Sequence, residues 1–380
     1  MTAAPTHPLT GLKVIELARI LAGPWAGQIF ADLGAEVIKI ESAAGDDTRQ
    51  WGPPFVTYAD GTSDAAYFHA ANRGKSSVVI DFKTSEGQAE VRRLVAGADV
   101  LIENFKVGTL AKYGLDYASL SALNPRLIYC SITGFGQDGP YASRPGYDFI
   151  VQGMSGIMDL TGNPDGPPQK IGVAFADIMT GLYAVIAIQA ALIARAASGS
   201  GEHIDMALFD VMTGVLANQA QNYLVTGQSP RRLGNAHPNI TPYAVFPVSD
   251  GWFILAVGND GQFRRFCTAM GLDALALDAR FTSNALRLEH RAVLEVLIGE
   301  ATRLHPRDDL LALLEKAGVP AGPINTVADA FADPQTIARA MQQVFTLPDG
   351  QKVAGVRTPI TFGRMSLNLG NAAPQLGADD

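Results

Sequence analysis

The sequence predicts an α/β protein, in which a large domain with a doubly wound parallel sheet is built from both chain ends and a smaller α/β domain lies between them. The first observation is length, because 380 residues fit about two domains of roughly 100–200 residues each. The second is composition, because 47% hydrophobic and 17% charged residues allow large buried cores. The third is an alternation of strand-length apolar runs with helical patterns, which is typical of βαβ units.

The alternation occupies the N-terminal part of the chain. The apolar runs are residues 12–17 (LKVIEL), 36–40 (EVIKI), 77–82 (SVVIDF), 99–103 (DVLIE) and 127–132 (LIYCSI). Helical spacing follows the first run at residues 25–35 and the third run at residues 87–96. Because crossovers between parallel strands are right-handed, we expect helices on both faces of the sheet.

The middle and the C-terminal parts are organised differently. Turn-rich loops at 134–140 and 162–168 enclose a predicted helix at 147–158, and a long apolar helix is predicted at 177–195. A Pro/Gly/Asn-rich stretch at 226–243 marks a linker or an active-site loop. A second unit follows, with a strand at 251–258, helices at 262–270, 290–304 and 307–317, and strand-like alternation in GVRTPITF near the end. We therefore expect a large domain at 1–225, a linker and small domain at 226–325, and a return to the large domain at 326–380.

Charge, cysteine content and hydropathy argue against several classes of partner. The net charge of −8 disfavours a nucleic-acid binder, which needs a basic face. Cys130 and Cys267 both lie in apolar stretches, so we expect buried thiols rather than disulfides or a zinc site. The longest apolar stretch, residues 182–194, is shorter than the about 20 residues that a membrane span needs. The N-terminus lacks the pattern of a signal peptide. We expect a cytoplasmic protein without a nucleic-acid, membrane or metal partner.

The common cofactor and hydrolase motifs are absent, which leaves acids as the candidates for chemistry. The segment ARILAGPWAG after the first strand is not a dinucleotide fingerprint, and neither a P-loop nor a nucleophile elbow occurs. Asp177 opens the long predicted helix, where helix N–H groups and the helix dipole should lower its pKa. Such a carboxylate can attack an activated carbonyl, although helix capping is the default interpretation. The same default applies to Asp148, which starts the preceding helix.

A glycine loop and several basic residues are weaker candidates. The loop GFGQDGP could offer backbone N–H groups to an oxyanion, although by itself it is an ordinary turn. Lys39, Arg49, Lys83, Lys106 and Lys112 fall at or just beyond the ends of predicted strands. Open α/β sheets bind ligands at that edge, and phosphates need cations, but each residue alone is equally a surface charge. The histidine of NAHPN is more often a loop-fixing residue than a catalyst.

Whole segments of the chain resemble a known family. They include GLKVIELARILAGPWAGQIFADLGAEVIKIE, NRGKSSVVIDFKTSEG, DVLIENFKVGTLAKYGLDY, NPRLIYCSITGFGQDGPY, GYDFIVQGMSG, ADIMTG and GVPAGPINTVADAFADPQ. The chain resembles the class III CoA-transferase family, which contains formyl-CoA transferase, carnitine and dicarboxylate CoA-transferases and α-methylacyl-CoA racemase. The resemblance covers nearly the whole length. It implies a large doubly wound domain, a small domain, and a homodimer of two interlocked chains.

The resemblance also implies roles for particular residues. The nucleophile of the family lies in a D-x-x-T-G element, which here is Asp177. Matching positions imply contacts with the pantetheine, thioester and acyl end of acyl-CoA, which are Ile20, Leu21, Ala22, Tyr147 and Asp148. Others imply contacts with the CoA nucleotide, which are Asn104, Phe105, Lys106 and Lys112, and Ile80 and Lys83 match a further turn that contacts CoA. CoA and acyl-CoA are substrates in this interpretation, and no permanently bound cofactor or metal is implied.

Two positions depart from the family pattern. Leu21 replaces a glutamine that helps to place oxalate in formyl-CoA transferase, which disfavours oxalate as the acceptor here. Ser42 replaces an arginine that touches the nucleotide phosphates in many relatives, and Arg49 or Lys39 are the open candidates to compensate.

The implied reaction is CoA transfer between acids through an aspartyl-CoA thioester. The segment RRLGNAHPNITPY resembles the branch that uses succinyl-CoA or similar dicarboxylates, so Arg231, Arg232 or His237 could face a distal carboxylate. A racemase is the main alternative, but it needs a histidine where this chain has Tyr147, and a phenol of pKa ~10 is a poor base. A non-catalytic acyl-CoA-binding protein is a third hypothesis, against which the intact Asp177 argues.

Overall fold

The computed structural model describes residues 6–347 and 349–380, which divide into two compact units. Unit 1 consists of Met1–Ile157, Lys170–Gln228 and Pro334–Asp380, and unit 2 of Met158–Gln169 and Ser229–Asp333. The segment Met158–Gln169 clusters with unit 2, whereas the sequence analysis assigns it to the first domain. Unit 1 resumes at Pro334, eight residues after the expected return at 326.

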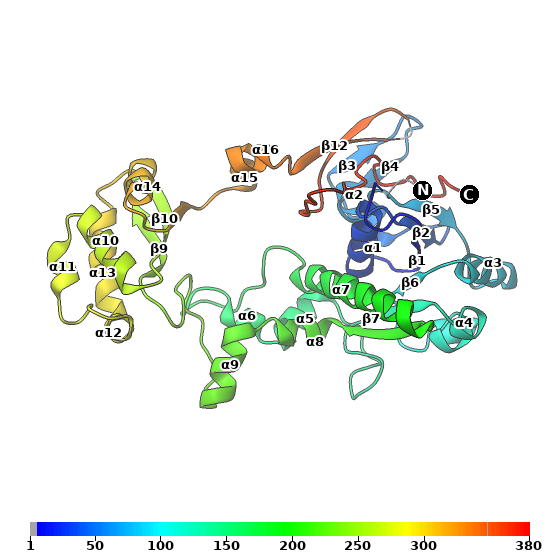
Figure 1. Cartoon of the computed structure of the whole chain (residues 1–380), viewed down its shortest axis with the longest axis horizontal. Coiled ribbons are helices and arrows are strands. Elements are labelled where there is room, and N and C mark those ends of the chain that lie inside the picture. The colour runs from blue at the N-terminus through cyan, green and yellow to red at the C-terminus, as the bar shows by residue number, and fades with distance from the viewer. Residues whose placement is uncertain (1–5, 348) are drawn as a thin grey trace. The chain divides into compact units, whose positions relative to one another are not determined.

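Six parallel strands of the described chain form the central sheet of unit 1 (Figure 1). The strands are β1 (Lys13–Glu16), β2 (Glu36–Glu41), β5 (Ser76–Val79), β6 (Val100–Glu103), β7 (Ile128–Thr133) and β8 (Glu202–Ala207). Their order is β5-β2-β1-β6-β7-β8, so the winding reverses between β1 and β6. The predicted doubly wound parallel sheet is therefore confirmed, and ligands of such sheets bind near the reversal, at the carboxyl ends of the strands.

Helices cover both faces of this sheet, as the alternation predicts. Val14 and Ile15 are neighbours on β1, and they point to opposite faces. Val14 belongs to the apolar cluster that packs on α1 (Ala22–Asp32) and α7 (Phe175–Ser198). Ile15 belongs to the cluster under α3 (Ser85–Ala96) and α4 (Tyr117–Leu123). Buried Cys130 lies in the first cluster, and Cys267 is buried in unit 2, so the prediction of two buried thiols is confirmed.

The long helix differs from its prediction in length. Helix α7 has 24 residues and by length and composition is apolar enough to cross a membrane, a test that core helices of other proteins also pass. It packs closely on α1, because a Cβ atom at Gly181 would lie 2.7 Å from the carbonyl oxygen of Ala22. The preceding predicted helix is interrupted at Gly156, whose φ of +93° ends one helix before the next begins. The two pieces are α5 (Asp148–Met154) and α6 (Ile157–Leu160).

The remaining elements of unit 1 surround the sheet. They are η1 (Asp47–Gln50), β3 (Phe55–Thr57), β4 (Ser63–Ala65), α2 (Ala66–Ala71), η2 (Leu110–Tyr113), α8 (Leu208–Gly214), α9 (Ala217–Thr226), α16 (Pro334–Ala338), β12 (Gln342–Thr346) and β13 (Lys352–Val356). The strand expected over GVRTPITF is mostly wrong, because β13 ends at Val356 and Pro359 cannot donate to a ladder. The C-terminus nevertheless joins unit 1, since Asp380 Oδ1 accepts a 2.7 Å hydrogen bond from the N–H of Val79 in edge strand β5.

Unit 2 is a small α/β unit with an antiparallel sheet in the order β11-β10-β9. Its elements are β9 (Tyr243–Val248), β10 (Gly251–Ala256), α10 (Asp260–Ala269), α11 (Asp273–Leu277), α12 (Asn284–Glu289), α13 (Arg291–Thr302), α14 (Arg307–Lys316), β11 (Ala321–Pro323) and α15 (Val327–Ala332). Helices α10, α13 and α14 and strand β10 confirm the helices and the strand predicted for this region. Phenylalanines dominate its core, where the buried Arg287 guanidinium donates to the carbonyl oxygens of Thr241 and Phe281.

Candidate active site

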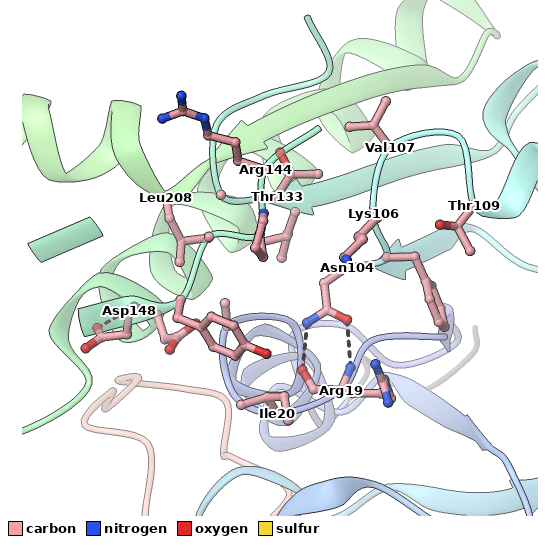
Figure 2. Close-up of a pocket in the computed structure, with 18 of the residues that line it drawn as sticks. Arg19, Ile20, Asn104, Lys106, Val107, Thr109, Thr133, Arg144, Asp148 and Leu208 are labelled. Atoms are coloured by element: carbon pink, nitrogen blue, oxygen red, sulfur yellow. Dashed lines mark hydrogen bonds between the residues drawn. The ribbon is translucent and has the colours of Figure 1, made fainter. Parts of the chain in front are cut away.

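A cavity of about 570 Å³ lies in unit 1 where the winding of the sheet reverses (Figure 2). Its walls come from the loops after β1, β6 and β7 and from the first turns of α5 and α7. The carboxyl ends of parallel strands therefore meet at this cavity, which is where doubly wound sheets bind their ligands.

The structure separates the predicted site residues into two groups. One group lines the cavity: Ile20, Ala22, Asn104, Phe105, Lys106, Tyr147, Asp148 and Asp177. The other group lies outside the lining: Leu21, Ile80, Lys83 and Lys112. The Leu21 and Ile80 side chains are buried, whereas Lys83 is exposed on a loop and Lys112 is exposed on η2. The loop of Ile80 and Lys83 adjoins the cavity wall, because the rings of Phe82 and Phe105 meet edge to face at 5.4 Å.

Asp177 is the third residue of α7, and its carboxylate accepts a hydrogen bond from the N–H of Ala22 at the start of α1. Burial, and then the negative charge of Asp148, raise the pKa of Asp177 to about 7, while the hydrogen bond from Ala22 acts in the opposite direction. The expected fall in this pKa is therefore wrong. Desolvation and a like charge outweigh the helix terminus.

Asp148, and not Asp177, caps the first turn of α7. Its Oδ1 accepts hydrogen bonds from the N–H groups of Ala176 at 2.7 Å and Asp177 at 3.4 Å. Its Oδ2 accepts from Gln152 Nε2 at 2.7 Å, and Gln152 Oε1 accepts from the N–H of Ile171 at 3.0 Å. This network satisfies two amides of the first turn of α7, inside which Asp177 lies, and it holds a second carboxylate beside Asp177.

The backbone between β1 and α1 is strained where it enters the cavity. Ile20 has φ of +70°, a conformation that β-branched residues rarely adopt and that costs about 1–3 kcal/mol. The N–H of Ile20 donates to both carboxylate oxygens of Asp46, at 3.2 and 3.3 Å. Asn104 accepts from the N–H of Arg19 at 2.8 Å and donates to its carbonyl oxygen at 2.6 Å (Figure 2).

Three cationic side chains line the cavity. Arg19 pairs with Asp47 at 3.0 Å, but both side chains are about half exposed, so the pair is weak. The Arg144 guanidinium stacks over the Tyr141 ring, 3.9 Å from its centroid. Among the residues that the structure describes, neither Lys106 nor Arg144 forms an ion pair with a carboxylate. Both remain available to an anionic ligand.

The two candidates for the cation missing at Ser42 are engaged elsewhere. Lys39 Nζ, fully buried, lies 3.0 Å from Glu16 Oε1 and 2.9 Å from Asp46 Oδ2. Arg49 forms a buried pair with Glu41 at 2.6 Å. Burial alone would lower the pKa of Lys39, but the carboxylates around it hold that pKa above its ordinary value. Neither of these open candidates therefore presents a free cation to a CoA phosphate.

The predicted residues of the NAHPN region lie in unit 2. Arg232 pairs with Asp159 at 2.7 Å, so its guanidinium is occupied. His237 Nδ1 lies 3.1 Å from the N–H of Asn239 and fixes its own loop. Arg231 is exposed on the same segment.

Two backbone N–H groups of the glycine loop GFGQDGP already have hydrogen-bond acceptors within the protein. The N–H of Gly136 donates to Thr133 Oγ1 at 2.9 Å, and that of Gln137 donates to Asp205 Oδ2 at 2.8 Å. These two amides therefore do not serve as free oxyanion donors. Gly134 has a packing role, since a Cβ atom there would lie 2.3 Å from the Cα atom of Gly146.

Several cavity residues escaped the sequence analysis. They are Arg19, Asp47, Trp51, Val107, Thr109, Ile132, Thr133, Ala142, Arg144, Pro145, Gly146 and Leu208. Arg144 carried a usable signal, because it is a cation just before the predicted helix that starts at GYDF. Trp51 carried none, because it follows η1 in an irregular turn that belongs to no predicted element. In the described ranges, no group of three His, Cys, Asp or Glu side chains could hold a metal ion.

Known proteins similar to this chain cover nearly all of it. The family model for CoA-transferase family III matches residues 9–380. The succinate–glutarate CoA-transferase of Agrobacterium fabrum is 59% identical over 381 residues, 99% of this chain and 95% of the relative. The succinyl-CoA:glutarate CoA-transferase of Homo sapiens is 38% identical over 371 residues, 97% of this chain and 84% of the relative.

A solved structure agrees with the fold. The crystal structure of a CAIB/BAIF family protein from Brucella suis superposes with a TM-score of 0.88 at 64% sequence identity. The match covers 98% of this chain and 97% of the other. The chain therefore belongs to CoA-transferase family III and is an enzyme of that class.

Proposed function

We propose that this enzyme transfers CoA from an acyl-CoA donor to a dicarboxylic acid through a covalent aspartyl-CoA thioester on Asp177, with succinyl-CoA as the first candidate donor. The observation that carries the proposal is the position of the Asp177 carboxylate. This carboxylate lines the cavity where the winding of the sheet reverses, and it accepts a hydrogen bond from the N–H of Ala22. Lys106 and Arg144, which have no carboxylate partners among the described residues, line the same cavity. The two relatives described above are named for succinate or succinyl-CoA and glutarate, which supports this acid class.

The proposed chemistry needs only the substrates and one protein nucleophile. The Asp177 carboxylate attacks the donor thioester carbonyl, the C–S bond breaks, and a mixed anhydride and CoA thiolate form. The thiolate attacks the aspartyl carbonyl, which gives an aspartyl-CoA thioester and releases the donor acid. The acceptor carboxylate then attacks this thioester, and the same two steps in reverse order give the new acyl-CoA and free Asp177.

Only the ionised form of Asp177 can begin this sequence. With a pKa of about 7, Asp177 loses its proton near neutral pH. We therefore expect kcat/KM to rise with pH through about 7 and to level off above it. A carboxylate of raised pKa is also a stronger nucleophile than an ordinary exposed aspartate.

The two cations without carboxylate partners, Lys106 and Arg144, suggest how the enzyme recognises a dicarboxylyl-CoA. Lys106 follows β6, in the stretch that the family resemblance assigns to the CoA nucleotide. Arg144 lies on the loop after β7, close in sequence to Tyr147 and Asp148. A guanidinium matches the geometry of a carboxylate, so Arg144 is our candidate for the distal carboxylate in place of Arg231 or Arg232.

The alternative activity, racemisation, finds little support in the cavity. An α-proton exchange between two faces needs two acid/base groups. No histidine lines this cavity among the described residues, and Tyr147 stands 67% exposed at the corresponding position. A transferase needs one carboxylate nucleophile, which Asp177 supplies.

A homodimer in the cytoplasm is part of the proposal. Helix α7 exposes Ile186 (60%) and Ile193 (75%), and α9 exposes Leu224 (73%) and Val225 (74%). Large apolar side chains exposed together mark surfaces that another molecule covers. We expect a second copy of this chain rather than lipid, because the family resemblance implies interlocked chains. Size-exclusion chromatography with light scattering in detergent-free buffer should show a stable dimer, and aggregation reversed by detergent would contradict this.

The test of the proposed function is a transfer assay with succinyl-CoA and a panel of monocarboxylic and dicarboxylic acids. Mass spectrometry should show new dicarboxylyl-CoA species with the wild-type enzyme and none with Asp177→Asn, whose amide cannot form the anhydride. In the absence of an acceptor, the wild-type chain should gain the mass of CoA less water. Deuterium wash-in on a 2-methylacyl-CoA without acyl transfer would establish the racemase instead.

A further inference from the structure

The connection between β1 and α1 combines strain with rigidity. Ile20 holds φ of +70° although its side chain is β-branched and glycine would adopt this conformation without cost. A strained backbone of this kind persists only where interactions with the surrounding structure offset its cost. Residues around Ile20 must therefore stabilise the turn.

The strained turn is held by two side chains of different kinds. Asn104 binds the backbone of Arg19 on both sides, and it lines the cavity itself. Asp46 binds the N–H of Ile20, is only 1% exposed, and does not line the cavity. Asp46 therefore influences the cavity only through the backbone that it holds.

The Asp46 carboxylate is itself anchored from several directions. Lys39 Nζ lies 2.9 Å from Oδ2, and the N–H and hydroxyl of Thr48 donate to Oδ1 at 3.0 and 2.8 Å. Lys39 Nζ also donates to the carbonyl oxygen of Ala18 at 2.8 Å and pairs with Glu16 of β1. The anchor thus ties the turn to strands β1 and β2 of the central sheet.

The turn determines where α1 begins and where its first N–H points. Leu21 is the N-cap residue and Ala22 the first helical residue, and the N–H of Ala22 is hydrogen-bonded to the Asp177 carboxylate. We propose that Asp46 is a positioning residue that holds the left-handed turn at Ile20 and thereby aims the first N–H of α1 at the carboxylate of Asp177. This inference rests on the proposed role of Asp177 as the nucleophile.

The expected consequence is a change in the titration of Asp177. The hydrogen bond from Ala22 favours the ionised carboxylate, so its loss should move the pKa upward. The charged or titratable groups that face Asp177 are Asp148 on α5, Tyr67 on α2 and the cavity residues Arg19, Asp47, Lys106, Arg144 and Tyr147. Asp46 also acts on Tyr67 through its charge, and the loss of that negative charge would by itself lower the pKa of a neighbouring carboxyl group. Only an upward shift of the Asp177 pKa is therefore attributed to the backbone turn.

The experiment compares Asp46→Ala, Asp46→Asn and the wild-type enzyme over a range of pH. For Asp46→Ala we expect kcat to fall about tenfold and the acidic limb of kcat/KM to move up by about one pH unit, the size of one charge-assisted hydrogen bond. KM for the acyl-CoA should change by less than about twofold. Asp46→Asn keeps an oxygen acceptor for Ile20 and should lie between the two, so it carries the test if Asp46→Ala does not fold.

Asp32→Asn is the matched control, because Asp32 is a fully buried, ion-paired aspartate at the other end of α1. It should lower the melting temperature without moving the acidic limb. A double-mutant cycle with Ile20→Gly sharpens the test, because glycine holds the left-handed conformation without help. The loss caused by Asp46→Ala should be several-fold smaller in the Ile20→Gly background. An equal loss in both backgrounds would overturn the proposal.

A readout independent of turnover separates this inference from the proposed function. The difference in melting temperature between the wild-type chain and Asp177→Asn, followed against pH, reports the titration of Asp177. In the Asp46→Ala or Asp46→Asn background, the midpoint of this curve should move upward. An unmoved midpoint in a folded variant overturns the positioning role, even if the wild-type enzyme transfers CoA. A moved midpoint with no CoA transfer by the wild-type enzyme supports the positioning role and refutes the proposed function.

Discussion

Unit 1 contains two clusters of charged side chains that differ in how their charges are satisfied. Beneath the turn between β1 and α1, Lys39 and Lys75 flank Glu16, and all three side chains are completely buried. In the cavity, Asp177 and Asp148 lie close together with like charge, while Lys106 and Arg144 have no carboxylate partners among the described residues. The same residue types therefore form a closed ion network in one place and an open, mismatched set in the other.

The pKa shifts of Lys39 and Asp177 follow this difference, whereas burial lowers the pKa of Lys75, in the closed network, to about 8. The carboxylates around Lys39 outweigh the effect of burial and raise its pKa, so this lysine stays charged. For Asp177, burial is the larger cause and the like charge of Asp148 is the second, and both raise the pKa toward neutrality. A closed network serves the scaffold, whereas a carboxylate held against its preferred state is typical of a site that meets a ligand or reacts.

The largest effect that could break this comparison is on stability. Lys39→Met would leave Asp46 and one side of Glu16 without a buried counter-charge, which should lower the free energy of unfolding by about 3–5 kcal/mol. Lys13→Met is the matched control, because Lys13 pairs with Glu36 at 3.2 Å on the surface of the same sheet, and it should cost about 1 kcal/mol or less. Urea unfolding measures both. Equal losses would mean that the buried network is no more than a set of ordinary ion pairs.

The next effect concerns the open cluster. Arg144→Ala should lower kcat/KM for dicarboxylic acceptors about 100-fold and leave monocarboxylic acceptors within about threefold, since only the former offer a distal carboxylate. Arg144→Lys should recover part of the loss, because it keeps the charge but not the planar fork. Steady-state kinetics over a matched series of mono- and diacids measures this. An equal loss for both classes would assign Arg144 to CoA or to the fold instead.

The smallest effect is a gain in stability at the cost of activity. Asp177 has a folded pKa of about 7 against an ordinary 3.8, so the unfolded state releases this proton first and stability falls as pH rises between these values. Asp177→Asn removes this penalty and should raise the free energy of unfolding by about 1–2 kcal/mol at pH 8, with little difference at pH 4. Thermal unfolding at both pH values measures it. A variant less stable than the wild type at pH 8 would show that the carboxylate is fully compensated in the folded state.

The sequence was a good guide wherever the relevant interactions are local or periodic. The apolar runs predicted strands β1, β2, β5, β6 and β7 because a strand buried on both faces reads as a continuous apolar segment. The helix break at Gly156 and the irregular tail after Val356 were missed, since a single φ value or a proline among apolar residues hardly alters such patterns. Asp177 was found through its family motif, and local reasoning alone favoured a helix cap for it.

By itself, the sequence determined the doubly wound parallel sheet, the family, and Asp177 as the carboxylate to examine. Only the tertiary structure decided that Asp148 caps α7, that Lys39 and Arg49 form buried ion pairs, and that the backbone of Ile20 is strained. The physical reason is that pKa values and ion pairs depend on groups brought together from distant positions. Asp148 and Asp177 are 29 residues apart, and Lys39 and Glu16 are 23 residues apart. Local periodicity carries no information about which distant partner a charged side chain will meet.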